Sequence, residues 1–348
     1  MLSKIGFGSL VLSLSMYAGC SPSDYSDFEF ADTQQGSLVD NGVELNGLKQ
    51  NGLKQNGLKQ NGLKQNGIGL HVASITDGNI TTAADADLSI TFSSSQLTQT
   101  LIDADLENGD TTKFRIDSVS YSASLGTSLY FLSNWDPTTG TWVSACGTDP
   151  TGTYAPVGTL IPAVAFADSW NLVNGTNVSD PNKFTFSCVN AAIGKCVVWG
   201  YKRWTNKQEC NGGNCKAQDL AFFHQACTRL VRADYCGDGK YHTRNGTGID
   251  VFDNLGIQNR DGVAGNSLEA DWRYDGAHCL RHTRWTRADE SDTSFATDLD
   301  YVSATCPSRL ASNDPSCADP DASHFFKANG FDDSLADRVV LRNESYQH

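Results

Sequence analysis

The stretch AQDLAFFHQACTRLVRADY, residues 217–235, divides the chain into two halves because it carries a clear helical pattern. The apolar side chains that fall at helical spacing are Leu220, Phe223, Cys227, Leu230 and Val231. The next four residues, CGDG (236–239), include two glycines that end the helix. We therefore predict an amphipathic helix here, with segments of a different character before it.

Upstream of this helix, residues 70–204 contain short runs of strand-forming residues. The runs that we predict as strands are DLSITF (87–92), KFRIDSVSY (113–121), SLYFLSNW (128–135), VGTLIPAVAF (157–166), KFTFSCV (183–189) and CVVWGYKR (196–203). Clusters of Gly, Asn, Asp and Pro separate the runs, as they do between antiparallel strands. The pattern predicts a β-rich domain over 70–204, folded as an antiparallel sandwich or a barrel-like sheet.

Downstream, residues 205–348 combine helices with strands. A second amphipathic segment covers about 292–305. The segments SLEADWRY (267–274) and CLRHTRW (279–285) are predicted to form a hairpin around DGAH. We therefore expect an α+β chain whose disulfide-rich C-terminal half packs against the β-rich part.

The cysteine count indicates an oxidising compartment. The chain has 11 cysteines, and Cys20 stands apart near the N-terminus. The remaining ten are Cys146, Cys188, Cys196, Cys210, Cys215, Cys227, Cys236, Cys279, Cys306 and Cys317. An even set in an exported chain predicts disulfides, here five with no free thiol. The two pairs expected to close local loops are Cys210 with Cys215 and Cys306 with Cys317.

The N-terminus, residues 1–19, has the pattern of an export signal. A lysine precedes an apolar core at 5–16, which is too short for a permanent membrane helix. Two small residues then precede Cys20, an ending that resembles the lipobox of bacterial lipoproteins. The resemblance implies a lipidated Cys20, attachment to the membrane through that lipid, and a place in the outer membrane or at the cell surface. The alternative is an ordinary cleaved signal that ends near a cysteine.

A polar spacer at 20–40 leads into a pentapeptide repeat, NGLKQ, at 41–69. A period of five gives no apolar stripe on a helix, and it sends alternate leucines to opposite faces of a strand. Two structures remain: a β-solenoid with one side per pentapeptide, or a disordered linker. Because a solenoid needs several stacked coils, we expect disorder or partial order docked on the globular part.

The formal charge of −14 excludes a general nucleic-acid binder, because neutralising phosphates requires clustered Lys and Arg. No later apolar stretch is long enough to span a bilayer. A membrane association would therefore depend on the predicted lipid anchor.

The segment HQACTRLVRADYCGDG (224–239) contains Ala-Asp-Tyr-Cys at 233–236. This signature resembles the ADYC domain of bacterial exported proteins, and the resemblance extends over roughly residues 110–345. Three other segments resemble that family: FTFSCVNAAIGKCVVWGYKRW (184–204), HTRNGTGIDVFDNLGI (242–257) and LEADWRYDGAHCLRHTRW (268–285). The resemblance carries no catalytic residues with it.

Two pairs of side chains have metal-ligand types. His224 and Cys227 lie three residues apart on the predicted helix, which is the spacing of a zinc site or a Cys-His nucleophile pair. An even cysteine count instead favours a half-cystine beside a packed histidine. His278 and His282 would need a helix to bind one ion, but their segment has a strand pattern.

The acidic, Gly-rich loops carry the remaining chemical candidates. The oxygen ligands that suit calcium are Asp238, Asn245, Asp250 and Asp253, although their spacing matches no EF-hand. The candidates for carboxylate-based hydrolysis are Asp234, His242 and Asp250. Asp-Gly and Asn-Gly also form turns in their own right. For Asp234 and Tyr235 we favour a structural role at the helix end.

Two functions follow. The first is a lipid-anchored envelope or surface protein that serves as a non-enzymatic binding or structural module, without a cofactor. Its ligand would be a glycan or another protein; the chain has 7 tryptophans, although core packing is their commoner use. The alternative is an extracellular carboxylate-based hydrolase, either with or without a bound calcium ion.

Overall fold

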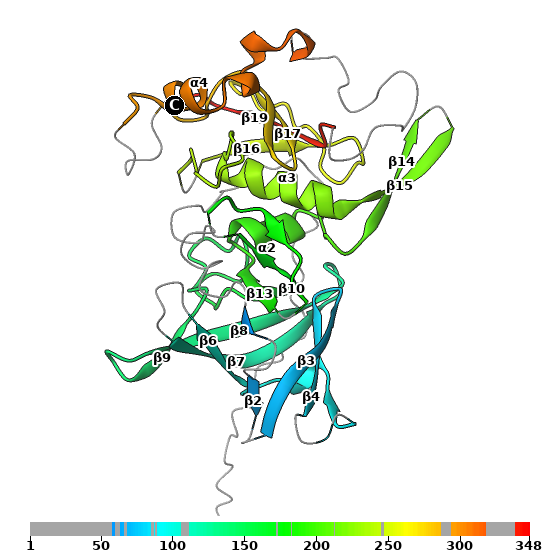
Figure 1. The fold of residues 1–348 in the computed structure, drawn as a ribbon, viewed down its shortest axis with the longest axis vertical. Helices are drawn as coiled ribbons and strands as arrows, with labels where there is room; N and C mark the ends of the chain where they lie inside the picture. Colours follow the sequence, from blue (N-terminus) through cyan, green and yellow to red (C-terminus); the bar gives the residue numbers. More distant parts are fainter. Residues whose placement is uncertain are drawn as a thin grey trace, which may run out of the picture.

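The computed structural model describes residues 58–59, 63–65, 68–84, 87, 89–105, 111–171, 173–181, 183–211, 213–244, 247–286, 294–317 and 338–348. The predicted signal at 1–19, the spacer at 20–40 and the candidate ligand Asn245 lie outside these residues. The described chain is a strand-rich α+β fold, with a large curled sheet below and a mixed region above in Figure 1. Among the described residues, no helix combines the length and apolar character needed to cross a membrane.

The large sheet has eleven strands, all paired antiparallel. Its order is β1 (Leu58–Lys59), β13 (Lys183–Cys188), β10 (Ala163–Ala167), β8 (Thr127–Asp136), β7 (Thr111–Ser122), β6 (Leu101–Asp105), β2 (Leu63–Gln65), β3 (Ile68–Thr76), β4 (Asn79–Ala84) and β5 (Thr91–Phe92). Strand β9 (Thr141–Ser144) pairs with β8 outside this path. A short 3-10 helix, η2 (Ser94–Gln96), follows β5.

The sheet curls so that the β3–β4 hairpin returns to β8. The Tyr130 hydroxyl of β8 donates to the Gly78 carbonyl at 3.1 Å and accepts from the Ile80 amide at 3.0 Å. Thr127 donates to the carbonyl of Asp77 at 2.7 Å. At Gly78, with φ of 73°, an added Cβ would lie 2.1 Å from the Thr127 hydroxyl. This close approach gives the predicted barrel-like shape.

Part of the pentapeptide repeat belongs to this sheet. Leu58–Lys59 pairs with β13, and Leu63–Gln65 lies between β6 and β3. Each of these strands comes from one NGLKQ unit, so two successive units enter the sheet at different places. The described part of the repeat is therefore docked on the body.

The second half is built on a four-stranded antiparallel sheet. Its order is β16 (Ile249–Phe252), β19 (Leu341–Ser345), β17 (Ser267–Arg273) and β18 (Gly276–Leu280). The C-terminal strand β19 is therefore an inner strand. The predicted hairpin is present as β17–β18, but its turn is Tyr274–Asp275, and β18 begins at Gly276 inside DGAH. The smaller elements are β11 (Ser169–Trp170), β12 (Asn177–Val178), β14 (Asn206–Asn211), β15 (Asn214–Asp219), α4 (Asp298–Thr305), η3 (Pro307–Arg309), η4 (Ala311–Asn313) and η5 (Pro315–Cys317).

Two helices join the halves. The predicted helix is confirmed as α3 (Leu220–Arg232), which packs on β17, β18 and β19. Helix α2 (Ala192–Val198) lies between α3 and β13, as Figure 1 shows. Its Ile193 and Val197 belong to the core of the large sheet, whereas Ala192 and Cys196 belong to the core of the second half.

The strand predicted over CVVWGYKR (196–203) is wrong, because α2 covers the start of this run. A short apolar run does not distinguish a buried strand from a buried helix, and α2 is apolar on both faces because it serves two cores. At Gly194 an added Cβ would lie 2.3 Å from the carbonyl oxygen of Cys188. Glycine therefore lets the helix pack closely on the end of β13.

All ten cysteines of the described chain are paired. The bridges are Cys146–Cys188, Cys196–Cys227, Cys210–Cys215, Cys236–Cys306 and Cys279–Cys317. The predicted pair Cys210–Cys215 is present, but the predicted pair Cys306–Cys317 is wrong. Helix α4 ends beside the turn that holds Cys236, and the following 3-10 turns carry Cys317 to β18.

Deleting residues 56–60 should leave the thermal stability unchanged. The deletion places Leu53 and Lys54 where Leu58 and Lys59 pair with β13, so the strand sequence is restored. Deleting only 56–58 moves a glutamine into the leucine position and should lower the melting temperature, because it changes the residues that pair with β13. Equal melting temperatures for the two deletions would contradict this role of β1.

The two disulfides Cys236–Cys306 and Cys210–Cys215 should differ in their contribution to stability. They close loops with sequence separations of 70 and 5 residues. Chain entropy predicts losses of about 4 and about 2 kcal/mol when each pair is changed to serine. Urea unfolding of the two double variants measures both losses. A larger loss for the Cys210–Cys215 variant would contradict the prediction.

Candidate functional site

The ADYC signature forms the turn that ends α3. The amide of Ala233 donates to the Leu230 carbonyl at 3.0 Å, and the amide of Asp234 donates to the Arg229 carbonyl at 2.9 Å. These two bonds define a Schellman motif, which usually places glycine at its left-handed position. Here Ala233 occupies that position with φ of 51°, and its methyl group is buried in the core of the second half.

Asp234 lies fully buried beneath this turn. Its Oδ2 accepts from the Arg229 guanidinium and from the Gly239 amide at 3.1 Å. Arg229 also donates to the Asn174 carbonyl and to the Thr176 hydroxyl, so the pair ties the turn to the β11–β12 connection. Burial raises the pKa of Asp234, against the opposing effect of the neighbouring guanidinium groups. The carboxylate therefore holds three chain segments together.

Tyr235 fills the space between two other aromatic rings. Its ring stacks on Trp272 at 5.6 Å and on His242 at 5.7 Å between centroids. Its hydroxyl donates to Glu269 Oε1 at 3.1 Å and accepts from the Arg284 amide at 3.2 Å. Burial raises the pKa of Tyr235 well above its ordinary value. The phenol is therefore a neutral, buried group whose hydroxyl makes two hydrogen bonds.

Glu269 and Arg284 form a fully buried ion pair next to Tyr235. Arg284 Nη2 lies 2.8 Å from Glu269 Oε1, and its Nε lies 3.0 Å from Oε2. Arg284 also donates to the Leu230 carbonyl of α3 at 2.9 Å, and Asn343 of β19 donates to Glu269 at 2.8 Å. Burial opposes ionisation of Glu269, but Arg284 outweighs it and holds the pKa of Glu269 below its ordinary value.

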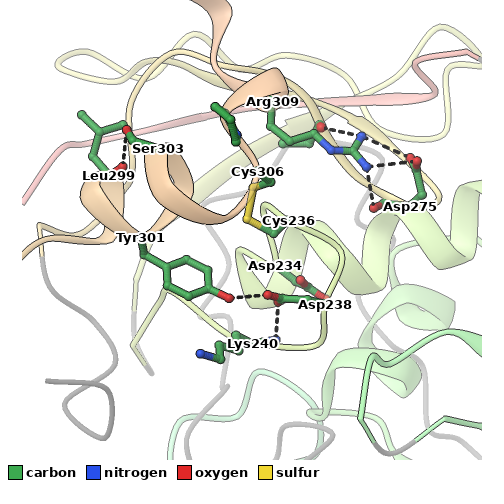
Figure 2. Close-up of a disulfide and its surroundings, with 12 residues drawn as sticks. Asp234, Cys236, Asp238, Lys240, Asp275, Leu299, Tyr301, Ser303, Cys306 and Arg309 are labelled. Carbon is green, nitrogen blue, oxygen red and sulfur yellow. Dashed lines mark hydrogen bonds and ion pairs between the residues drawn. A yellow bond between two sulfur atoms is a disulfide. The ribbon is translucent and has the colours of Figure 1, made fainter. Parts of the chain in front are cut away.

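Cys236 and the two residues after it are held by contacts with other segments, as Figure 2 shows for Cys236 and Asp238. Cys236 is bonded to Cys306, and Tyr301 of α4 donates to the Asp238 carboxylate. Burial raises the pKa of Tyr301 to about 12. Between them, Gly237 packs so tightly on the β17–β18 turn that an added Cβ would lie 1.8 Å from the Asp275 carbonyl oxygen.

His242 pairs with α4. Its Nδ1 lies 2.8 Å from Asp298 Oδ1, and its backbone amide donates to the Arg232 carbonyl at 3.1 Å. The imidazole is only 3% exposed, and its ring lies 4.8 Å from that of Tyr301. The Asp298 contact orients the ring, which then packs inside the protein.

Asp250 and Asp253 each bind backbone amides of their own loop. Asp250 Oδ2 accepts from the amides of residues 261 and 262 at 2.9 and 3.0 Å. Asp253 accepts from the amides of residues 255, 257 and 258 and from the Tyr201 hydroxyl at 2.7 Å. Burial raises the pKa of both carboxyl groups. Both therefore shape turns.

The contacts of the described residues do not join the predicted catalytic set. Asp234 pairs with Arg229, His242 with Asp298, and Asp250 with backbone amides. The calcium candidates Asp238, Asp250 and Asp253 likewise have separate partners, and Asn245 lies outside the described residues. Within the described part of the chain, one group of His, Cys, Asp or Glu has ligand atoms close together: His278, Cys279 and Cys317. Two of these three are bonded to each other as a disulfide.

The helix pair His224 and Cys227 is structural, in agreement with the half-cystine interpretation. Cys227 is bonded to Cys196 of α2, and His224 Nε2 lies 3.0 Å from the Ile193 carbonyl oxygen. Burial lowers the pKa of His224 to about 3. The imidazole is therefore neutral and serves the contact between α2 and α3.

Two features of the structure do not follow from the sequence pattern. The first is the ion pair Glu269–Arg284. A hairpin pattern predicts neighbours across two strands only, whereas this pair also has hydrogen-bond partners on α3 and β19. The sequence pattern likewise does not show the pair of exposed Trp135 and half-buried Trp142, whose rings come together only through the register of β8 and β9. The alternation in SLYFLSNW and the neighbouring DPTTG turn were the available signals.

Fold and site together define a disulfide-stabilised α+β protein in which the ADYC signature closes a helix onto a small sheet. The chain belongs to the ADYC domain family, whose model matches residues 94–286, more than half of the chain. The resemblance inferred from the signature is therefore confirmed. No curated protein and no solved structure matches the chain.

Changing Arg284 to methionine should destabilise the protein by about 3–5 kcal/mol, because it leaves the Glu269 carboxylate buried without its counter-ion. The double variant R284M/E269Q should recover part of this loss, since glutamine carries no charge. Chemical unfolding at neutral pH measures the free energy of unfolding of the wild type and of each variant. A double variant no more stable than R284M would contradict the role of the charge.

The pH dependence gives a second measurement on the same pair. Because the pKa of Glu269 is lower in the folded than in the unfolded state, its stabilising effect is complete above the unfolded pKa. The effect is lost as the pH falls through the folded pKa. The E269Q variant should therefore lose less stability on acidification than the wild type.

Proposed function

We propose that this chain is a lipid-anchored protein of the cell envelope whose body is a non-enzymatic binding or structural module. The supporting observation is that its candidate titratable groups serve structural contacts. The carboxylates and the histidine that the sequence offered for catalysis each have a structural partner, and their contacts do not meet at one site. A binding module requires a stable body with a free surface, and it requires no such convergence.

The disulfides support export. Five bridges among the described residues suit an oxidising compartment, and they leave the ten body cysteines without a thiol. Cys20 is then the remaining cysteine of the chain, at the position where a lipoprotein signal places its acylated residue. The cysteine count therefore agrees with the lipidation proposal.

The N-terminal segment gives the proposed anchor a defined reach. Residues 20–58 separate the lipidation site from β1, and a chain of this length spans at most about 130 Å. Because β1 is docked in the large sheet, the tether ends on the β-rich half. The C-terminal half would then be the part farther along the chain from the membrane.

One observation favours the hydrolase alternative. Asp298 binds Nδ1 of His242, which is how a carboxylate orients a general-base histidine and leaves Nε2 for substrate. The burial of His242 opposes this use, since a substrate would have to displace part of α4. The geometry therefore supports the binding module better.

Metabolic labelling with an alkyne palmitate in a Gram-negative host tests the anchor. The wild type should be labelled and should sediment with membranes, whereas Cys20→Ala should be unlabelled and remain soluble. An unlabelled wild type would indicate an ordinary cleaved signal and contradict the proposal. For the second half of the proposal, isolated envelope glycans are incubated with the protein. Product release by the wild type that is absent in H242Q, at an unchanged melting temperature of the variant, would establish the hydrolase instead.

A further inference from the structure

The outer face of β7, β8 and β9 carries two tryptophans. Along β7 and β8, Phe114, Ile116 and Leu132 point into the buried core of the large sheet. Side chains alternate along a strand, so the residues between them point outward. Trp135 of β8 lies on this outer face and pairs directly with Trp142 of β9. The two large rings therefore lie on the solvent side of the sheet.

The two rings support each other at an angle. Their centroids are 5.4 Å apart with an interplanar angle of 65°, and Trp135 is 37% exposed. The guanidinium of Arg115 lies 4.6 Å from the centre of the Trp142 ring. Trp142 is thus held between Arg115 and Trp135, while Trp135 presents apolar surface to water.

Polar groups are fixed beside these rings. Arg115 Nε lies 2.6 Å from Asp117 Oδ1, and the Ser133 hydroxyl donates to Asp117 Oδ2. The side chains of Arg115 and Asp117 are 26% and 22% exposed. Among the described residues, this ion pair uses only the Nε of Arg115, which leaves its two amino groups as donors. A donor pair and an acceptor therefore adjoin the aromatic surface.

The hairpin that carries the tryptophans is rigid. In the β8–β9 turn, the Asp136 carboxylate accepts from the Thr138 amide and the Thr139 hydroxyl, each at 2.8 Å. Just after β9, the Cys146–Cys188 bridge ties the chain to β13. A surface held in place in this way loses little conformational entropy when a ligand binds.

We propose that Trp135, Trp142, Arg115 and Asp117 form a carbohydrate-binding surface for a β-linked chain of gluco-configured sugars. The flat C–H face of such a sugar matches an exposed indole, and its equatorial hydroxyls match the Arg115 donors and the Asp117 acceptor. The surface holds one cation and one anion, and the whole chain is strongly acidic, so an uncharged polymer fits better than an anionic one. This inference rests on the proposed binding function and specifies its ligand class.

The competing interpretation is a cross-strand pair that only stabilises the hairpin. The test therefore compares binding with stability. The mature chain carrying Cys20→Ser is titrated with cellohexaose and chitohexaose, followed by tryptophan fluorescence and calorimetry. The variants are W135A, R115Q and, as a matched control, Y121A, which removes another exposed aromatic residue of the same sheet. Thermal unfolding is recorded for each.

The wild type should bind at least one hexamer saturably. W135A should bind about tenfold more weakly, a loss of about 1.4 kcal/mol. R115Q should also be weakened, whereas Y121A should match the wild type. Binding that W135A leaves unchanged would overturn the proposal, as would the absence of saturable binding to both hexamers.

Two further outcomes separate this inference from the proposed function. Binding to envelope fragments or to lipid vesicles, with neither hexamer bound, would overturn the carbohydrate surface and leave the binding module standing. Shortened oligosaccharides after incubation would overturn the non-enzymatic function, and the W135A comparison would still decide whether this surface holds the sugar.

Discussion

The C-terminal half depends on one buried ion pair, Glu269 with Arg284. Two charges without solvent are tolerable only when hydrogen bonds offset their desolvation, and here those bonds come from distant segments. Leu230 of α3 supplies a carbonyl, Tyr235 a hydroxyl, and Asn343 of β19 an amide. The signature turn, the hairpin and the C-terminal strand must therefore be in place together before the pair is satisfied. This requirement couples the positions of the three segments.

Helix α2 connects this C-terminal half to the β-rich half. One face of this helix packs in the core of the large sheet and the other in the core below α3, where the Cys196–Cys227 bridge joins the two helices. Glycine at 194 brings α2 onto the end of β13, and Arg229 binds the β11–β12 connection from the other side. The two cores are therefore separate clusters that α2 joins.

Local patterns predicted local structure well and long-range structure poorly. Helix α3 and the β17–β18 hairpin follow from spacing and turn residues alone. The run at 196–203 was assigned to a strand because periodicity cannot separate two kinds of buried segment. The predicted pairing of Cys306 with Cys317 is wrong for a similar reason, since proximity in sequence says little once successive 3-10 turns lead the chain away from the end of α4. The acidic loops suggested a shared site, but each carboxylate binds its own turn instead.

The distribution of polar groups indicates where a function can lie. In the signature half, Asp234, Tyr235 and His242 face inward and hold the fold, so changing them would alter stability before it altered any ligand contact. The outer face of β7 to β9 has the opposite character: Trp135 contributes exposed apolar surface beside the half-buried Trp142, and the ion pair keeps unused donors. Selection for folding alone would favour small polar residues at such positions, since an indole that stays exposed adds little hydrophobic stabilisation. The residues that name the family therefore build the scaffold, and the proposed binding surface lies outside the signature, on β7 to β9.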